Sequence, residues 1–582
     1  MGCGTSGQSS VARPDCPECL NREKTNGISI NWERLKAVAQ LAKTNSREVR
    51  NVMNANNVDQ TKVSISDQSG KVRSGEEGLF ELPTEEFMHG MLGLTIDDDR
   101  IRVILDTIAE GDLFVDFEFP TQSALYYSDR SQDDIVWMRP KDLVDCPVLF
   151  LDGTSRHDIA QGILGDCWLL SSCAAVAGRS DLMERVIPSN QPLFGEGYDG
   201  IVQFRFWRFG SWVKVYIDDQ LPTKDGRLIY ASCTDPTEFW VSLLEKAYAK
   251  LHGSYEAIEG GQTMDALVDL TGGLAERYDL ISDEKRSDGE SSLYKHLLQS
   301  CASGSFVTCS RKGDWRKAVR ADNKGLVAGH AYTITDVKQI TTSSSDTIDL
   351  LRIRNPWGNE TEWNGHWSDM SHDWSRVNER EKEIMDFKNQ SDGEFWMNFN
   401  DFATEFEEVS ICTLGPDFDS DGTVDRVGQV KAIKGEWVMH KTSGGSRNDF
   451  LRFATNPQFV ITLATENLNL GEKSSSSVVI CLMQEHRRSD RSKGVHMHQI
   501  GFVLYKCPND DCNRRLPAEY FMYNYAEGST GTFINYREVF GRFELAAGNY
   551  IVVPATFEPD SPSRFIIRVY ASDAFTLREV FD

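Results

Sequence analysis

The spacing of apolar and polar residues changes several times along this chain, and these changes predict its domains. Between residues 31 and 52, apolar side chains recur every three or four positions, which predicts an amphipathic helix. Residues 59–77 are rich in Ser, Gly and charged side chains and predict a linker. Further segments that predict the beginnings of helices follow this linker. We therefore expect a flexible tail over residues 1–30 and a helical extension over residues 31–112.

Beyond residue 112 the pattern predicts an α+β protein. Residues 113–262 contain a long amphipathic helix predicted at 238–251, whereas residues 263–414 are richer in strand-like alternation. From about residue 427 onward, short alternating apolar runs are separated by turns, which predicts an antiparallel β-sandwich over residues 427–582. An acidic stretch at 415–426 predicts the linker before it.

The composition narrows the class of protein. The 582 residues are 40% hydrophobic and 26% charged, as in an ordinary globular protein of three or four domains. The formal net charge of −26 argues against a nucleic-acid partner, because binding phosphates requires clustered Lys and Arg. No apolar run approaches the roughly 20 residues that span a bilayer. The 13 cysteines are odd in number and scattered, which favours a reduced, intracellular chain.

The first residues, MGCGTS, predict lipidation. They match the N-myristoylation signal, with Gly2 exposed once Met1 is removed, and Cys3 beside it is a candidate palmitoylation site. A single myristoyl chain binds membranes only marginally, so the second chain matters. We expect a cytoplasmic protein at the inner face of the plasma membrane. The basic cluster at 486–493 is a candidate contact with anionic lipid, although a solvated hairpin fits it equally well.

The most informative segment for chemistry is QGILGDCWLL at 161–170. A glycine-punctuated loop turns there into an apolar helix, with Asp166 as a candidate N-cap. A thiol at a helix N-terminus lies at the positive end of the helix dipole, which favours the nucleophilic thiolate. Cys167 is therefore the candidate nucleophile.

A cysteine nucleophile needs a base and a group that orients the base. His330 lies in GHAYTI at 329–334, and Asn355 lies in RNPWG at 354–358, each beside a strand-like segment. The order Cys, His, Asn along the chain is that of papain-type peptidases. Gln161, six residues before the cysteine, lies where such enzymes place an amide donor for the oxyanion.

Together these three segments resemble the calpain family of calcium-dependent cysteine proteases. Further motifs occur in the family's order, including EFW at 238–240, LEKAYAK at 244–250 and DGEFWM at 392–397. The resemblance implies a papain-like, two-lobed protease core, with the cysteine in residues 113–262 and the histidine and asparagine in 263–414. The catalytic residues that it implies are Cys167 as nucleophile, His330 as general acid and base, Asn355 as its orienter, Gln161 as oxyanion donor and Trp357 as the ring that shields the His–Asn hydrogen bond.

The resemblance also implies calcium as the cofactor, bound at two sites in the protease core. The residues implied for the first site are Leu151, Gly153, Asp158 and Glu238, and those for the second are Glu362, Asp369, Gln390, Asp392 and Glu394. Without calcium, repulsion among these carboxylates is expected to keep the two lobes misaligned. Calcium would then select the arrangement in which the triad is assembled.

The expected partners are protein substrates, with no penta-EF-hand small subunit, because no such module is recognised up to Asp582. Two other functions stay open. A transglutaminase also uses Cys and then His, but it orients the histidine with Asp. A catalytically silent, membrane-tethered calcium-binding adaptor would retain the fold without the activity.

Overall fold

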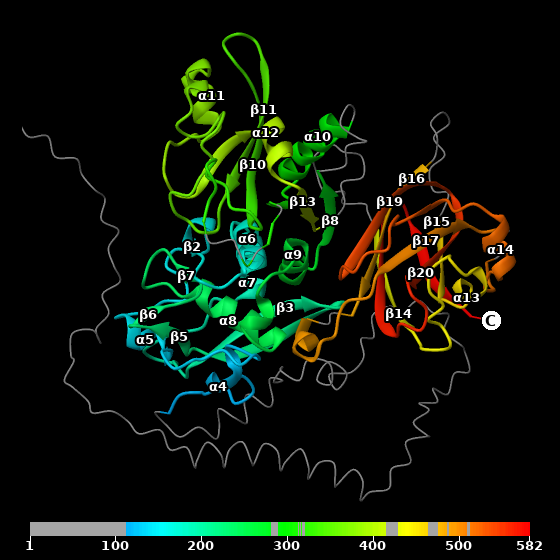
Figure 1. The fold of residues 1–582 in the computed structure, drawn as a ribbon, viewed down its shortest axis with the longest axis horizontal. Coiled ribbons are helices and arrows are strands. Elements are labelled where there is room, and N and C mark those ends of the chain that lie inside the picture. The colour runs from blue at the N-terminus through cyan, green and yellow to red at the C-terminus, as the bar shows by residue number, and fades with distance from the viewer. Residues whose placement is uncertain are drawn as a thin grey trace, which may run out of the picture.

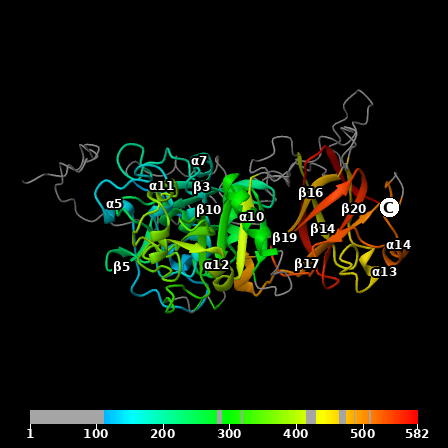
Figure 2. The ribbon, with the colours of Figure 1, turned by 90° about the horizontal axis from the view of Figure 1, so that it is seen from above.

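The computed structural model of the chain describes residues 112–581, except 281–288, 312, 315, 317–319, 415–428, 464–474, 486–487 and 509–511. The predicted acylated tail, almost all of the helical extension and the acidic linker lie outside the described residues. The described part is α+β, as predicted. The mixed α/β part before residue 415 and the mostly stranded part after residue 428 lie side by side in both views (Figures 1 and 2).

The first lobe packs helices around short strands. Its elements are α4 (Thr121–Ala124), β1 (Val136–Met138), α5 (Pro140–Leu143), η2 (Arg156–Asp158), β2 (Ile159–Ala160), α6 (Cys167–Val176), α7 (Ser180–Val186), β3 (Ile201–Arg208), β4 (Ser211–Asp218), β5 (Leu221–Lys224), β6 (Arg227–Leu228), β7 (Ser232–Cys233), α8 (Trp240–His252), η3 (Glu256–Ile258) and α9 (Thr263–Thr271). The apolar residues of α6, α8 and α9 share one core. Helix α9 therefore packs with the first lobe, although the sequence pattern placed it in the second half.

Helix α8 differs from its prediction in two respects. It begins at Trp240 rather than Glu238, and all 13 of its residues are buried, so it has no exposed polar face. Its charged side chains are paired inside the lobe: Lys250 Nζ donates to Asp116 Oδ2 at 2.7 Å, and Lys246 forms an ion pair with Asp218. A buried charge is tolerated only with such partners.

The second lobe is built on one antiparallel sheet of six strands, in the order β12-β11-β10-β9-β13-β8. Its elements are β8 (Leu274–Asp279), α10 (Gly289–Ala302), β9 (Phe306–Ser310), β10 (Ala331–Thr341), β11 (Thr347–Arg354), η6 (His372–Arg376), α11 (Glu379–Ile384), β12 (Glu394–Asn398), α12 (Phe399–Glu405) and β13 (Glu408–Thr413). Helix α6 lies against β10, at the junction of the two lobes (Figure 1).

The predicted β-sandwich is confirmed, with sheets β14-β21-β16-β19 and β18-β17-β20-β15-β22. Its elements are β14 (Gln429–Trp437), α13 (Phe450–Phe453), β15 (Gln458–Leu463), β16 (Ser475–Gln484), η7 (Arg488–Lys493), β17 (Ile500–Lys506), α14 (Ala518–Tyr523), β18 (Gly528–Ser529), β19 (Glu538–Ala546), β20 (Gly548–Thr556), β21 (Ser563–Ala571) and β22 (Phe575–Val580). All its strand pairs are antiparallel. The alternating runs predicted as strands at 458–463, 478–483, 499–505, 548–554 and 564–570 correspond to β15, β16, β17, β20 and β21.

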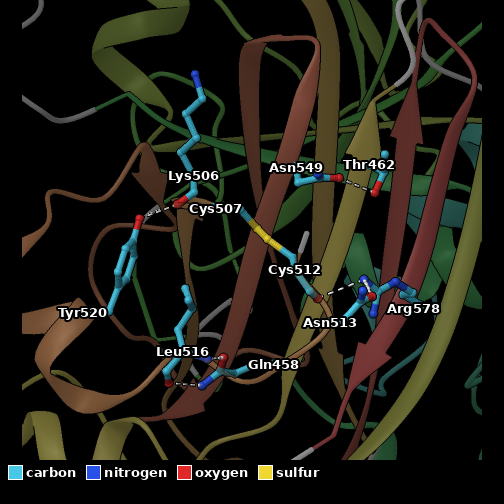
Figure 3. Close-up of a disulfide and its surroundings, with 10 residues drawn as sticks. All are labelled: Gln458, Thr462, Lys506, Cys507, Cys512, Asn513, Leu516, Tyr520, Asn549 and Arg578. Carbon is cyan, nitrogen blue, oxygen red and sulfur yellow. Dashed lines mark hydrogen bonds between the residues drawn. A yellow bond between two sulfur atoms is a disulfide. The ribbon is translucent and has the colours of Figure 1, made fainter. Parts of the chain in front are cut away.

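A disulfide joins Cys507, just after β17, to Cys512 (Figure 3). The expectation of a fully reduced chain is therefore wrong at this pair. Nearby, the Cys512 carbonyl accepts a hydrogen bond from Arg578 of β22 at 2.9 Å, and the Tyr520 hydroxyl donates to the Lys506 carbonyl at 2.6 Å (Figure 3). Over the described ranges, no helix has both the length and the apolar character needed to cross a membrane.

Arginines of the sandwich dock it onto the protease lobes. Arg537 donates to Asp269 Oδ1 at 2.6 Å and also lies 3.3 Å from Asp265 Oδ1, both on α9. Arg542 donates to Glu276 of β8 at 2.9 Å. The Arg537 pairs are almost completely buried, whereas the Arg542 side chain is about one third exposed.

This difference in burial predicts that substituting the two arginines destabilises the protein by different amounts. Arg537→Met would remove a counterion that two buried carboxylates share, leaving Asp269 with Arg208 as its ion-pair partner, and destabilise the protein by about 3–5 kcal/mol. Arg542→Met, as the matched control, would cost about 1 kcal/mol or less, because its pair is partly screened by water. Thermal unfolding of both variants beside the parent measures this. Equal melting temperatures for the two variants would contradict the interpretation.

Candidate active site

Cys167 is the first residue of α6, as predicted, but Asp166 does not cap the helix as predicted. Asp166 occupies the N-cap position without a side-chain capping bond. Its Oδ1 instead accepts a hydrogen bond from Gln161 Nε2 at 3.4 Å. Burial raises the pKa of Asp166 to about 7, and its carboxyl group hydrogen bonds to that of Glu245. Two acids in such contact hold a proton between them, and a protonated pair makes a poor cap.

The surroundings of Cys167 favour the thiol over the thiolate. Burial raises its pKa to about 12, and the hydrogen bonds from the Ala331 and Trp168 backbone N–H groups offset this only in part. The predicted dipole effect at the helix N-terminus is thus outweighed by desolvation in this arrangement.

His330 lies directly before β10, and three residues organise its ring. Its Nε2–H donates to Asn355 Oδ1 at 2.9 Å. The same oxygen accepts the Trp357 backbone N–H at 3.1 Å, while Asn355 Nδ2 donates to the Thr361 carbonyl at 3.1 Å. The Trp357 ring lies 5.2 Å from the His330 ring, centroid to centroid. Burial lowers the pKa of His330 to about 4, so its imidazole is neutral near pH 7.

The structure thus brings His330, Asn355 and Trp357 together and places Cys167 beside Ala331, the residue after the histidine. Among the hydrogen bonds of the described residues, none joins the Cys167 thiol to the His330 ring. Gln161 ties the two lobes through its backbone N–H, which donates to the Pro356 carbonyl at 3.1 Å. Its Nε2 donates to the Leu164 carbonyl at 2.8 Å, and its buried Oε1 has no partner in the part of the chain described.

The residues proposed for the first calcium site lie close together. Glu238 Oε1 accepts the Leu151 N–H at 3.0 Å, and Asp158 Oδ2 accepts the Ser155 N–H at 2.6 Å. The pKa of Glu238 is raised to about 7, first by burial and then by repulsion from acids that include Asp158 and Asp152. Gly153 has a φ of 101° and turns the chain between these residues.

Three of the residues proposed for the second site also repel one another. Burial and the charges of Glu362 and Asp392 raise the pKa of Asp369 to about 7, although the Trp396 and Gln390 N–H groups bind it. Burial and Asp392 likewise raise the pKa of Glu362.

Gly393 connects this group to Asn355. Its N–H donates to Glu362 Oε1 at 2.7 Å, and its carbonyl accepts the Asn355 N–H at 2.8 Å. Its φ is 86°, and a Cβ there would lie 3.2 Å from the Asn355 carbonyl oxygen, so glycine is required.

Glu394 differs from the other acids proposed for the second site. Its carboxylate pairs with Arg156 at 3.0 Å and lies 3.9 Å from Arg352, which together hold its pKa below the usual value against the effect of burial. Its carboxylate is therefore already paired with arginines. In the residues described, no group of three or more His, Cys, Asp or Glu side chains converges closely enough to hold a metal ion. The oxygens of Glu362, Asp369 and Glu238 are bound instead by backbone N–H groups.

Sequence reasoning missed several residues that shape this site. Arg156 of η2 joins the lobes through its ion pair with Glu394 of β12, and Arg354 donates to the Asp392 carbonyl at 3.2 Å. Glu245 was missed as well, although an acid on an apolar helix face is a visible signal. The arginines carry no such signal, because their partners lie far away in sequence.

Comparisons with known proteins support one family. A family model described as "Calpain family cysteine protease" matches residues 114–413, and one described as "Calpain large subunit, domain III" matches residues 433–570. "Calpain-A" of Drosophila melanogaster is 42% identical over 489 residues, which cover 83% of this chain and 58% of that protein. "Calpain-1 catalytic subunit" of Rattus norvegicus is 40% identical over 532 residues, which cover 89% of this chain and 72% of that protein. The chain spans about half to two thirds of the length of the first curated relatives it matches.

The burial of Cys167 and His330 predicts that the Cys167 thiol reacts slowly with alkylating agents in the absence of calcium. With the pKa of Cys167 at about 12 and that of His330 at about 4, almost no thiolate exists at pH 7. Iodoacetamide labelling of the Cys167 peptide, followed by mass spectrometry, should speed up about tenfold per pH unit up to pH 10. A plateau near pH 7 would show that an ion pair with His330 is already formed.

Proposed function

Because the chain belongs to the calpain family of cysteine proteases, we propose that it is a calcium-dependent cysteine endopeptidase that cleaves protein substrates at limited sites. The observation that carries the proposal is the arrangement of His330, Asn355 and Trp357 beside the start of α6. In it, the Asn355 oxygen holds His330 Nε2, so that Nδ1 remains for the thiol.

In the proposed reaction, His330 Nδ1 takes the proton of the Cys167 thiol, and the sulfur attacks the peptide carbonyl carbon. The negative charge that develops on the carbonyl oxygen is bound by N–H groups of Gln161 and Cys167. His330 then gives its proton to the leaving amine. A water molecule, deprotonated by His330, hydrolyses the thioester and restores the thiol. Asn355 orients the ring throughout and stabilises its charged form.

Gln161 must change partners for this step. Of the two hydrogen bonds made by its Nε2, the 3.4 Å bond to Asp166 is the weaker, so this N–H is the one available to the oxyanion. The bond to the Leu164 carbonyl at 2.8 Å keeps the amide in place.

The donor set of the two acid groups fits calcium, which prefers carboxylate and carbonyl oxygens. In the first site, Asp158 and Glu238 would bind through carboxylates, and Leu151 and Gly153 through carbonyls. In the second, Glu362, Asp369 and Asp392 would bind through carboxylates, and Gln390 and Glu394 through carbonyls. Bound calcium supplies positive charge that offsets the repulsion which raises the pKa values of Glu238 and Asp369.

The lobes are tied near both acid groups, which supports coupling between calcium binding and the triad. Gly393 joins Glu362 to Asn355, and η2, which contains Asp158, leads into β2 and then Gln161. Rearrangement of either acid group therefore acts on a catalytic residue within a few bonds. We further propose acylation at Gly2 and Cys3 and a location at the cytoplasmic face of the membrane; this rests on the N-terminal signal alone.

Cleavage of casein tests the proposed function. With calcium, the purified protein should release peptides, and the Cys167→Ser variant should release none, because a hydroxyl is a far weaker nucleophile than a thiolate. Without calcium, the parent should be inactive. Amine incorporation without cleavage would identify a transglutaminase, and neither activity would favour the silent adaptor.

Asp369→Asn tests the second calcium site through two effects of opposite sign. The folded-state pKa of about 7 lies above the ordinary value of about 4, so the parent loses stability as the pH rises from 4 to 7. Asparagine keeps the acceptor for the Trp396 N–H but carries no charge. The calcium-free variant should therefore melt higher than the parent at pH 8, while needing more calcium for half-maximal cleavage.

Asp386→Asn is the matched control, since Asp386 is an exposed acid paired only with Lys388 among the described contacts. It should change neither the calcium requirement nor the melting temperature. An unchanged calcium requirement in Asp369→Asn would remove Asp369 from the site.

A further inference from the structure

Two hydrogen bonds form a ladder between the start of α6 and the start of β10. Beside them, the Ala331 N–H lowers the pKa of the Cys167 thiol, against the larger effect of burial, which raises it. The Ser171 hydroxyl donates to the Ala331 carbonyl at 3.0 Å, and the Thr333 hydroxyl donates to the Ser171 carbonyl at 2.7 Å. Cys167, one helical turn before Ser171, thus lies at the start of a set of contacts that runs along the strand leading away from His330.

The ladder bonds can form side by side because one turn of the helix and two residues of the strand cover nearly the same distance. Cys167 and Ser171 are one helical turn apart, a rise of about 6 Å. Ala331 and Thr333 lie on one face of β10, about 6.6 Å apart. The residues between and after them, Tyr332 and Ile334, pack on the other face into the core of the second lobe.

Because these hydrogen bonds are buried, they fix the position of α6 along β10. Ser171 is completely buried, and Thr333 and Ala331 are 1% and 5% exposed, so water cannot replace a lost partner. Apolar packing alone tolerates small sliding of a helix on a strand. A slide of α6 along β10 would leave buried hydroxyls and carbonyls unpaired, which costs more than the hydrogen bonds contribute.

We propose that Ser171 and Thr333 are positioning residues of this active site: their hydroxyls hold α6 in one register on β10 and so set the place of the Cys167 sulfur relative to the His330 ring. The inference rests on the proposed peptidase function, which it deepens. Neither side chain needs to touch substrate, because both act through the backbone that carries the catalytic pair.

Ser172 provides a matched control on the same helix. It is also completely buried, and its hydroxyl donates to the Trp168 carbonyl at 2.8 Å and the Thr263 carbonyl at 3.1 Å. These partners lie on α6 and α9, so Ser172→Ala loses comparable hydrogen bonds without affecting the contact to β10.

The experiment compares Ser171→Ala, Thr333→Val, Thr333→Ser and Ser172→Ala in the full chain with excess calcium. Ser171→Ala and Thr333→Val should each lower kcat for a casein-derived peptide by about three- to tenfold, because each variant loses one of the hydrogen bonds that position α6. KM should not change. Thr333→Ser keeps the hydroxyl and should restore kcat. Ser172→Ala should match Ser171→Ala in melting temperature but keep the parent kcat.

A second readout does not depend on cleavage. At pH 9, the rate of iodoacetamide labelling at Cys167 should fall in Ser171→Ala and Thr333→Val, because a displaced Ala331 N–H no longer lowers the pKa of the thiol. If both variants keep the parent labelling rate and lose no more kcat than Ser172→Ala, the ladder is only structural and the proposal is overturned. If the parent cleaves nothing but the labelling rates fall, the peptidase assignment fails while the positioning role stands.

Discussion

The burial of Cys167 and His330 is the constraint on which the site depends, because burial acts against both charges that the proposed reaction needs. It raises the pKa of the thiol and lowers that of the imidazole, so each group alone stays neutral. Only close approach reverses this, since each charge then stabilises the other. Reactivity is therefore decided by how α6 lies on the second lobe, a property of packing rather than of either side chain.

Several buried charges elsewhere in the described residues form ion pairs, and the two acid groups around Glu238 and Asp369 differ from them. Lys250 with Asp116 and Arg537 with Asp269 are paired, and such pairs fasten α8 and the sandwich in place. Glu238 and Asp369 are instead bound by backbone N–H groups and face other acids, which raises their pKa values. In these two groups the electrostatic repulsion lies in loops that lead to Asn355 and Gln161. That is where a cation would do most to change the relation of the lobes.

Local patterns predicted much of this molecule correctly. The strands of the sandwich were found because alternation marks a strand with one buried face, and α6 was found because an apolar run follows a glycine-rich loop. The prediction failed where a tertiary contact competes with a local preference. Asp166 has the right position for a cap, but its carboxyl group is bound to Glu245 and Gln161. Helix α8 has a polar face in sequence, yet partners from distant segments bury it.

The sequence alone determined which chemical groups are present and in what order: a cysteine at a helix start, a histidine and an asparagine beside strands, and acids clustered near both. These follow from residue identity and short-range spacing. Only the tertiary structure decided their ionisation and mutual placement, including the ladder from Ala331 through Ser171 to Thr333 and the pairing of Glu394 with arginines. The physical reason is that desolvation and hydrogen bonding depend on neighbours in space, and here those neighbours come from segments more than a hundred residues apart.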